Sequence, residues 1–243
     1  MAIHHKPLII AHRGAAGEAP ENTLAAFRLG MEQGCDAIEL DIHLSKDGEI
    51  IVCHDETIDR TSDGTGAIRE LTVAEIKRAD AGGWFSEKYA GERIPLLEEV
   101  FELVPSSIMI NIEIKSSFEQ RLETTLARLL RRTARLSSVV VSSFDFNCLA
   151  VLKQIEPEAR IGLLYEDKAT LADPTNQLTV PVYSLHPYFG KLDIEDAREA
   201  VRQGLRVYPW TVNGEEQIRL MIEYGVSGVI TDYPGRMKKI LGS

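Results

Sequence analysis

The chain has 243 residues, of which 44% are hydrophobic and 26% are charged. This composition is ordinary for a globular protein and excludes an intrinsically disordered chain. The excess of 37 acidic over 27 basic residues gives a formal net charge of −10, which disfavours nucleic acids and anionic lipid surfaces as partners. A ligand that carries phosphate would need a local site of opposite charge.

The lack of a targeting-signal pattern and the pattern of the cysteines predict a cytoplasmic protein. Met1–Pro7 holds no apolar stretch of the signal-peptide type, and no window of 18 apolar residues occurs, so we expect no stable membrane association. The three cysteines, Cys35, Cys53 and Cys148, are odd in number and scattered. This pattern indicates reduced core thiols rather than a disulfide framework or a metal site.

Short β-rich runs alternate with longer helical patterns along the chain. The predicted strands are 8–11, 37–44, 108–114, 139–142, 161–164, 182–185, 206–209 and 228–230. The predicted helices are 21–33, 97–104, 119–136, 145–155, 194–203 and 215–224. Eight strands that alternate with helices, in a chain of this length, predict an α/β fold of the (β/α)8 TIM-barrel class.

Helix 119–136 has a leucine stripe on one face. Four arginines lie around its other face, which we expect to be solvated: Arg128, Arg131, Arg132 and Arg135.

One apolar run, Ile50–Cys53, is left over from the barrel count. It follows the turn sequence Lys46-Asp47-Gly48, so we expect an antiparallel hairpin on the end of the second strand. The next segment lacks a strand pattern and contains a capping box from Thr72 to Glu75. We interpret about 56–95 as an insertion over the active face, within a single domain that spans 1–243.

Three carboxylates are expected at the carboxyl ends of the strands, where barrel enzymes have their active sites. Glu39 and Asp41 point to the same side of the second strand, and Glu113 faces the mouth from the next barrel strand. Such carboxylates repel one another unless a cation or a proton lies between them. An oxygen-rich site without a cysteine or histidine cluster suits one divalent ion, Mg²⁺ or Ca²⁺, and indicates metal-assisted hydrolysis.

Two histidines are acid/base candidates because imidazole titrates near neutral pH. His12 follows the first strand, and the hairpin returns His54 opposite residues near 40. Each histidine alone is also compatible with a structural role, Glu39 and Asp41 with a solvent-facing sheet edge, and Glu113 and Lys115 with a simple ion pair. The two histidines and the three carboxylates together on one barrel face favour an active site.

Aromatic residues follow two of the later strands. Phe144 and Trp210 can form an apolar wall for a substrate, or can pack in the core or rim. His186, at the end of strand 182–185, can be either a rim contact or a structural residue.

An ordered set of motifs runs through nearly the whole chain and resembles the glycerophosphodiester phosphodiesterases. That family shares a TIM-barrel-like fold with phosphatidylinositol-specific phospholipase C. The motifs are His12-Arg13-Gly14, Pro20-Glu21-Asn22-Thr23, Glu39-Leu40-Asp41, His54-Asp55, Glu113-Ile114-Lys115, Trp210-Thr211-Val212-Asn213 and Thr231-Asp232-Tyr233-Pro234. The chain looks most like the short cytosolic bacterial members.

The resemblance implies a function and a role for each matching residue. It implies hydrolysis of glycerophosphodiesters to sn-glycerol 3-phosphate and an alcohol, with first attack by a free glycerol hydroxyl and with the insertion covering the site. The implied roles are acid/base catalysis by His12 and His54, binding of one divalent ion by Glu39, Asp41 and Glu113, and phosphate binding by Arg13 and Lys115.

Two other functions remain open at this point. A lysophospholipase D or phosphoinositide-type lipase would be expected to have an apolar lid and a membrane-facing patch, which the net charge of −10 disfavours. A non-catalytic barrel that binds glycerophosphodiesters would be expected to lack a histidine or carboxylate of the set. The expected partner is a small-molecule glycerophosphodiester, with no nucleic acid, and the sequence carries no signal for an oligomeric state.

Overall fold

The computed structural model describes residues 6–117, 119–172 and 178–242. Residues 1–5, part of the segment inspected for a signal peptide, lie outside the described residues. Eight parallel strands in the described chain are ordered β8-β7-β6-β5-β4-β2-β1-β9. Their bounds are β1 Leu8–His12, β2 Ala37–Leu44, β4 Met109–Ile114, β5 Val139–Ser143, β6 Arg160–Tyr165, β7 Ser184–Pro187, β8 Arg206–Val207 and β9 Gly228–Thr231.

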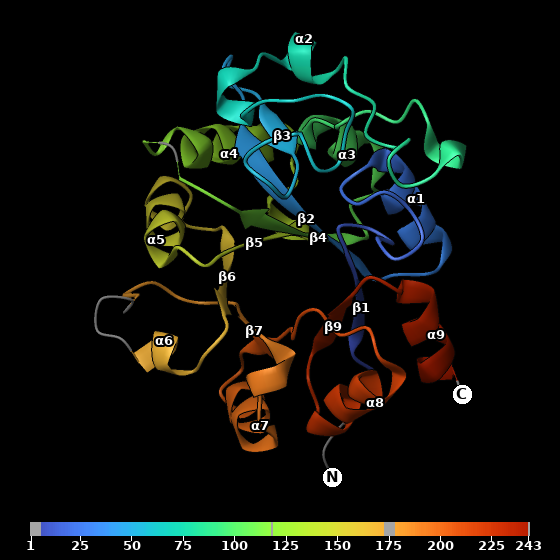
Figure 1. Ribbon diagram of the computed structural model, residues 1–243. Coiled ribbons are helices and arrows are strands. Elements are labelled where there is room, and N and C mark those ends of the chain that lie inside the picture. The colour runs from blue at the N-terminus through green and yellow to red at the C-terminus, as the bar shows by residue number, and fades with distance from the viewer. Residues whose placement is uncertain (1–5, 118, 173–177, 243) are drawn as a thin grey trace.

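The two ends of this strand path meet and close a barrel (Figure 1). The Ser227 amide donates to the Val207 carbonyl, and the Ile230 amide donates to the Pro209 carbonyl, each at 3.0 Å. The (β/α)8 prediction is confirmed. Two strands differ from the prediction by two residues: β7 begins at Ser184 and ends at Pro187 rather than 182–185, and β8 ends at Val207 rather than at 209.

Helices surround the strands (Figure 1). They are α1 Leu24–Glu32, α3 Leu97–Leu103, α4 Arg121–Arg132, α5 Phe146–Ile155, α6 Ala169–Ala172, α7 Ile194–Arg202, α8 Glu215–Tyr224 and α9 Pro234–Gly242. The sequence patterns do not predict α6 or α9. Among the described residues, no helix is both long enough and apolar enough to cross a bilayer.

The predicted helix 119–136 is shorter in the structure. Glu119 and Ala134 have positive φ angles of 48° and 54°, so the helical conformation is confined to the residues between them. The prediction that Arg135 lies on a solvated helix face is wrong, because this side chain is buried. Its Nη1 donates to the Val104 carbonyl at 3.0 Å and its guanidinium lies 5.2 Å from the Phe101 ring, so it caps the end of α3.

Alternation along each strand separates two environments. On β2, Ile38, Leu40 and Ile42 join the hydrophobic core between the strands and the helices. A smaller cluster contains Ile10, Ala37, Tyr208 and Ile230. On β1 and β2, the alternate positions beyond this cluster carry His12, Glu39 and Asp41. The barrel is therefore apolar toward one end and polar at the carboxyl ends of its strands.

The predicted hairpin forms as expected. β3, Ile50–Val52, pairs antiparallel with β2 so that Val52 lies opposite Ile42. The Cys53 amide donates to the Asp41 carbonyl at 3.0 Å, which brings the following residue, His54, to the carboxylates.

The segment after the hairpin packs as a small layer over β3 (Figure 1). It contains η1 Ile68–Glu70, α2 Val73–Ile76 and η2 Glu87–Tyr89, and the predicted capping box between Thr72 and Glu75 is present. Its buried cluster comprises Ile51, Cys53, Ile58, Ile68, Ile76, Ala79, Ala81 and Ile94. Two further short 3-10 turns, η3 Leu136–Ser138 and η5 Phe189–Lys191, precede β5 and follow β7.

Candidate active site

Three buried carboxylates meet where β2 and β4 run side by side. Asp41 lies opposite Glu113 in the ladder, and Glu39 points to the same side of β2 as Asp41. Oxygen atoms of the three side chains lie within 4.8 Å of one another. Asp41 Oδ1 is buried without a hydrogen-bond partner, and the donor set consists of carboxylate oxygens, which fits a hard divalent cation.

The electrostatics of this cluster also favour a cation. Burial raises the pKa of Glu39 well above its usual range, and the charge of Asp41 adds to the increase. Burial and the charge of Asp41 raise the pKa of Glu113 to about 7. Burial also opposes ionisation of Asp41, but the charges of Arg13 and Lys115 outweigh it and lower the pKa of Asp41. A divalent ion would stabilise the ionised form of all three groups.

Two cationic side chains border the carboxylates. Arg13 has a positive φ of 51°, its amide donates to Glu39 at 3.0 Å, and its Nε lies 3.2 Å from Asp41 Oδ2. Lys115 Nζ lies 2.8 Å from Glu113 Oε1 and 3.6 Å from Asp41 Oδ1. The two cations therefore offset part of the negative charge of the carboxylate cluster.

His54 is oriented by two neighbours. Its Nδ1 lies 2.6 Å from Asp55 Oδ1, and its Nε2 lies 3.2 Å from Lys115 Nζ. Because an ammonium group has no acceptor, Nε2 accepts and Nδ1 carries the proton that bonds Asp55. Burial lowers the pKa of His54, although the charge of Asp41 opposes this change. The hydrogen bond from Lys115 and the lowered pKa therefore both favour a neutral His54 imidazole whose Nε2 faces Lys115.

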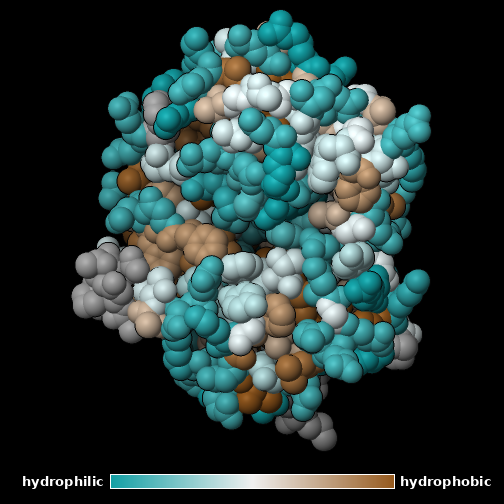
Figure 2. Space-filling model, viewed as in Figure 1, coloured by the Kyte–Doolittle hydropathy of each residue, from teal (hydrophilic) through white to brown (hydrophobic). Residues whose placement is uncertain are grey.

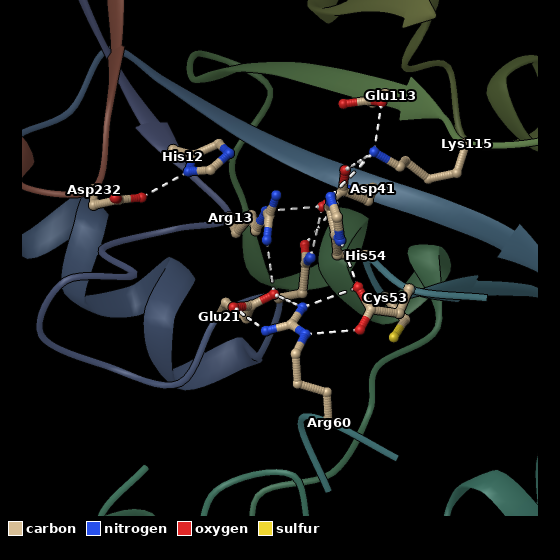
Figure 3. A network of polar contacts seen from close by, with 12 residues as sticks. His12, Arg13, Glu21, Asp41, Cys53, His54, Arg60, Glu113, Lys115 and Asp232 are labelled. Carbon is tan, nitrogen blue, oxygen red and sulfur yellow. Dashed lines mark hydrogen bonds and ion pairs between the residues drawn. The ribbon is translucent and has the colours of Figure 1, made fainter. Parts of the chain in front are cut away.

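His12 is held in the same manner on the other side of the site (Figure 3). Its Nδ1 lies 2.6 Å from Asp232 Oδ1, and its Nε2 lies 4.0 Å from Glu39 Oε2. Asp232 in turn accepts a hydrogen bond from Asn213 Nδ2 at 2.6 Å. The two histidines flank the carboxylates, and each is paired with an aspartate through Nδ1.

Several residues that hold the site together have no role predicted from the sequence. Asp232 and Asp55 orient the histidines, Asn213 holds Asp232, and Glu21 accepts from Arg13 Nη1 at 2.9 Å. Arg60 bonds both Glu21 and Asp55. The acidic residues and Asn213 stand within the motifs quoted above, so the signal was present, whereas no motif singled out Arg60.

The aromatic residues predicted at the mouth lie close together. The rings of Phe144 and Trp210 meet edge to face at 5.6 Å, and the Tyr188 ring lies 5.7 Å from that of Trp210. Phe144 and Tyr188 are exposed. Figure 2 shows a hollow near the centre of this face, with hydrophilic side chains above it and hydrophobic ones on the left.

His186 is not a rim residue. Its side chain is fully buried, its Nε2 lies 2.8 Å from Ser184 Oγ, and burial lowers its pKa to about 3.

Fold and site together define a class of protein, the TIM-barrel enzymes whose polar site lies at the carboxyl ends of the strands. Within that class, a buried acidic cluster flanked by two cations and two histidine–aspartate pairs suits the chemistry of an anionic ester.

Comparison with known proteins specifies the family. A sequence profile of the glycerophosphoryl diester phosphodiesterase family matches residues 12–236. A glycerophosphodiester phosphodiesterase from Caldanaerobacter subterraneus subsp. tengcongensis is 44% identical over 233 residues, which cover 94% of this chain and 95% of that protein. A protein of the same name from Bacillus altitudinis is 39% identical, with 96% of this chain and 97% of that protein covered. The chain belongs to the glycerophosphoryl diester phosphodiesterase family and is an enzyme of that type.

Solved structures agree with this assignment. An Oleispira antarctica phosphodiesterase, solved in complex with the product sn-glycerol-3-phosphate, superposes with a TM-score of 0.88 at 30% identity, covering 98% of this chain and 97% of that chain. The glycerophosphodiester phosphodiesterase of Thermotoga maritima gives a TM-score of 0.80 at 31% identity, with 98% and 99% covered.

Proposed function

We propose that the protein hydrolyses glycerophosphodiesters to sn-glycerol 3-phosphate and an alcohol by two-histidine acid/base catalysis. The observation that carries the proposal is the pair of imidazoles on either side of one carboxylate cluster, each paired with an aspartate through Nδ1 at 2.6 Å. The product complex of the Oleispira antarctica relative supports sn-glycerol 3-phosphate as the product. The whole chain acts as one domain, with about 56–95 as its insertion.

Each part of the site has a role in this reaction. Arg13 and Lys115 bind the phosphodiester, and one imidazole takes the proton of the attacking hydroxyl as its oxygen bonds phosphorus. The other imidazole gives a proton to the departing alkoxide as its bond to phosphorus breaks. When the attacking hydroxyl is that of the glycerol, this step leaves a cyclic phosphate; water then attacks phosphorus with the two imidazoles in exchanged roles, and the ring P–O bond breaks to give sn-glycerol 3-phosphate. A divalent ion, Mg²⁺ or Ca²⁺, bound by Glu39, Asp41 and Glu113 would supply positive charge against the charge that builds on the phosphate oxygens.

The aromatic residues give the substrate a second contact. Phe144 and Trp210, whose rings meet at 5.6 Å, form an apolar wall for the carbon skeleton of the glycerol or of the alcohol.

The partner is a small phosphodiester rather than nucleic acid, in keeping with the net charge of −10. We also place the protein in the cytoplasm, which the three free, buried thiols support.

The test follows glycerophosphocholine in the presence of Mg²⁺ or Ca²⁺. We expect release of sn-glycerol 3-phosphate, read by a coupled dehydrogenase, to stop with EDTA and to return with either ion in excess. His12→Ala and His54→Ala should each lower turnover by about 10²–10⁴ without loss of metal binding by calorimetry. Binding of glycerophosphocholine without turnover would indicate the non-catalytic barrel instead. Faster cleavage of lysophosphatidylcholine would indicate the lysophospholipase D alternative.

A further inference from the structure

Arg60 lies just beyond His54, at the start of the insertion, and joins two carboxylates. Its Nη1 and Nη2 donate to the two oxygens of Glu21, at 2.9 and 2.7 Å. Its Nε and Nη2 donate to the two oxygens of Asp55, at 2.7 and 3.1 Å. Each carboxylate is therefore held by two hydrogen bonds from one planar group, the geometry that a guanidinium provides and an ammonium does not.

Each of these carboxylates also holds a residue of the proposed site, as Figure 3 shows for Glu21 and Arg13. Glu21 Oε1 accepts from Arg13 Nη1 at 2.9 Å, and Asp55 Oδ1 bonds His54 Nδ1 at 2.6 Å. One guanidinium thus connects a phosphate-binding residue after β1 with an acid/base residue after β3.

The contacts argue against a direct role for Arg60 on the substrate. The four hydrogen bonds to Glu21 and Asp55 use most of its N–H donors, and the two carboxylates offset its charge. The hydrogen bond from Arg60 also keeps the pKa of Asp55 well below its usual range. Burial raises the pKa of Glu21, but Arg60 and Arg13 outweigh burial and lower it, so both carboxylates stay ionised.

We propose that Arg60 is a positioning residue that fixes Arg13 and His54 relative to one another through Glu21 and Asp55. The inference rests on the proposed function, because it gives those two residues their roles. It also predicts which kinetic constant each connection controls. The Glu21 connection acts on phosphate binding and hence on KM, whereas the Asp55 connection acts on His54 and hence on kcat.

The central experiment compares Arg60→Ala with Arg69→Ala. Arg69 lies in the same insertion, 65% of its side chain is exposed, and its partner Glu70 is 3.8 Å away, so it is a matched control. We expect Arg60→Ala to lower kcat/KM by about 10- to 100-fold, as outer-sphere partners of a site do, and Arg69→Ala to leave it unchanged. Added guanidinium ion at non-denaturing concentration should restore part of the activity of Arg60→Ala alone.

Single-connection variants separate the two effects. Asp55→Asn should lower kcat with little change in KM, and Glu21→Gln should mainly raise KM. Arg60→Ala combined with Asp55→Asn should lose less than the product of the single losses, because both changes interrupt the same connection. Arg60→Lys should recover little activity, since an ammonium cannot form the four hydrogen bonds in one plane.

A second readout does not depend on activity. The imidazole Nδ1–H signal of His54 in NMR spectra reports its bond to Asp55, and it should shift or broaden in Arg60→Ala but not in Arg69→Ala. The inference is refuted if Arg60→Ala matches the control in kcat/KM and in this signal. Should Arg60→Ala not fold, a folded Arg60→Lys with wild-type kcat/KM refutes it equally. Full turnover by His54→Ala would instead overturn the proposed function, which keeps the two failures distinct.

Discussion

The substitution Asp232→Asn tests whether His12 works through its aspartate partner. Asn213 determines how the new amide would lie. Asn213 Nδ2 donates to Asp232 Oδ2 at 2.6 Å, and its Oδ1 accepts from the Asp232 amide at 2.9 Å. The asparagine oxygen must therefore take the Oδ2 position, and its NH₂ group must take the Oδ1 position that faces His12 Nδ1 at 2.6 Å.

An NH₂ group there donates to Nδ1 and leaves the proton of neutral His12 on Nε2. Nε2 then cannot accept a proton from an attacking hydroxyl. General acid–base catalysis contributes about 10²–10⁴ to rate, so kcat should fall by this factor, which corresponds to about 2.7–5.4 kcal/mol in the activation free energy. The fold should change little, because shape and volume are conserved.

The assay is release of sn-glycerol 3-phosphate at saturating substrate, with the thermal midpoint measured alongside. The double variant Asp232→Asn with Asn213→Asp is the matched rescue. A carboxylate at 213 accepts from the new amide, so the amide turns and presents its oxygen to His12 Nδ1. We expect the double variant to be at least about tenfold more active than the single one. A kcat for Asp232→Asn within about threefold of wild type would refute the reasoning.

Three further predictions concern the metal, the packing and the thiols. Affinity for Mg²⁺ or Ca²⁺ should rise as pH increases through about 7, because Glu113, whose pKa is raised to about 7, must lose its proton to bind the ion; calorimetry that shows no pH dependence would contradict this. Gly162→Ala should destabilise the fold by about 1–3 kcal/mol in urea unfolding, since its Cβ would lie 2.4 Å from His186 Nε2; an unchanged midpoint would argue against it. Cys35 and Cys148, whose pKa values burial raises to about 12, should resist a thiol reagent until the protein unfolds, and rapid labelling of the native protein would disprove their burial.

The sequence by itself determined the barrel and the direction of its strand residues. Side chains alternate with a period of two along a strand, so apolar Ile38 and Leu40 fixed the opposite side for Glu39 and Asp41. The hairpin was determined in the same way, because a short turn sets the register, and His54 returned to the carboxylates as expected. The side-chain directions and the hairpin follow from local geometry, whereas the barrel follows from the number and order of the strand and helix patterns along the whole chain.

Only the tertiary structure decided which loops meet. His12 and Asp232 are separated by 220 positions in the chain and become neighbours because closure of the barrel places β9 beside β1. Arg60 finds Glu21 39 residues away, and Arg135 leaves its expected helix face to cap α3. Such partners depend on where separate loops lie after packing. The local conformational preferences of one loop do not determine its position relative to the other. The sequence therefore predicted that Glu39, Asp41 and Glu113 would lie together, whereas the contacts that orient the proposed catalytic residues could not be predicted from it.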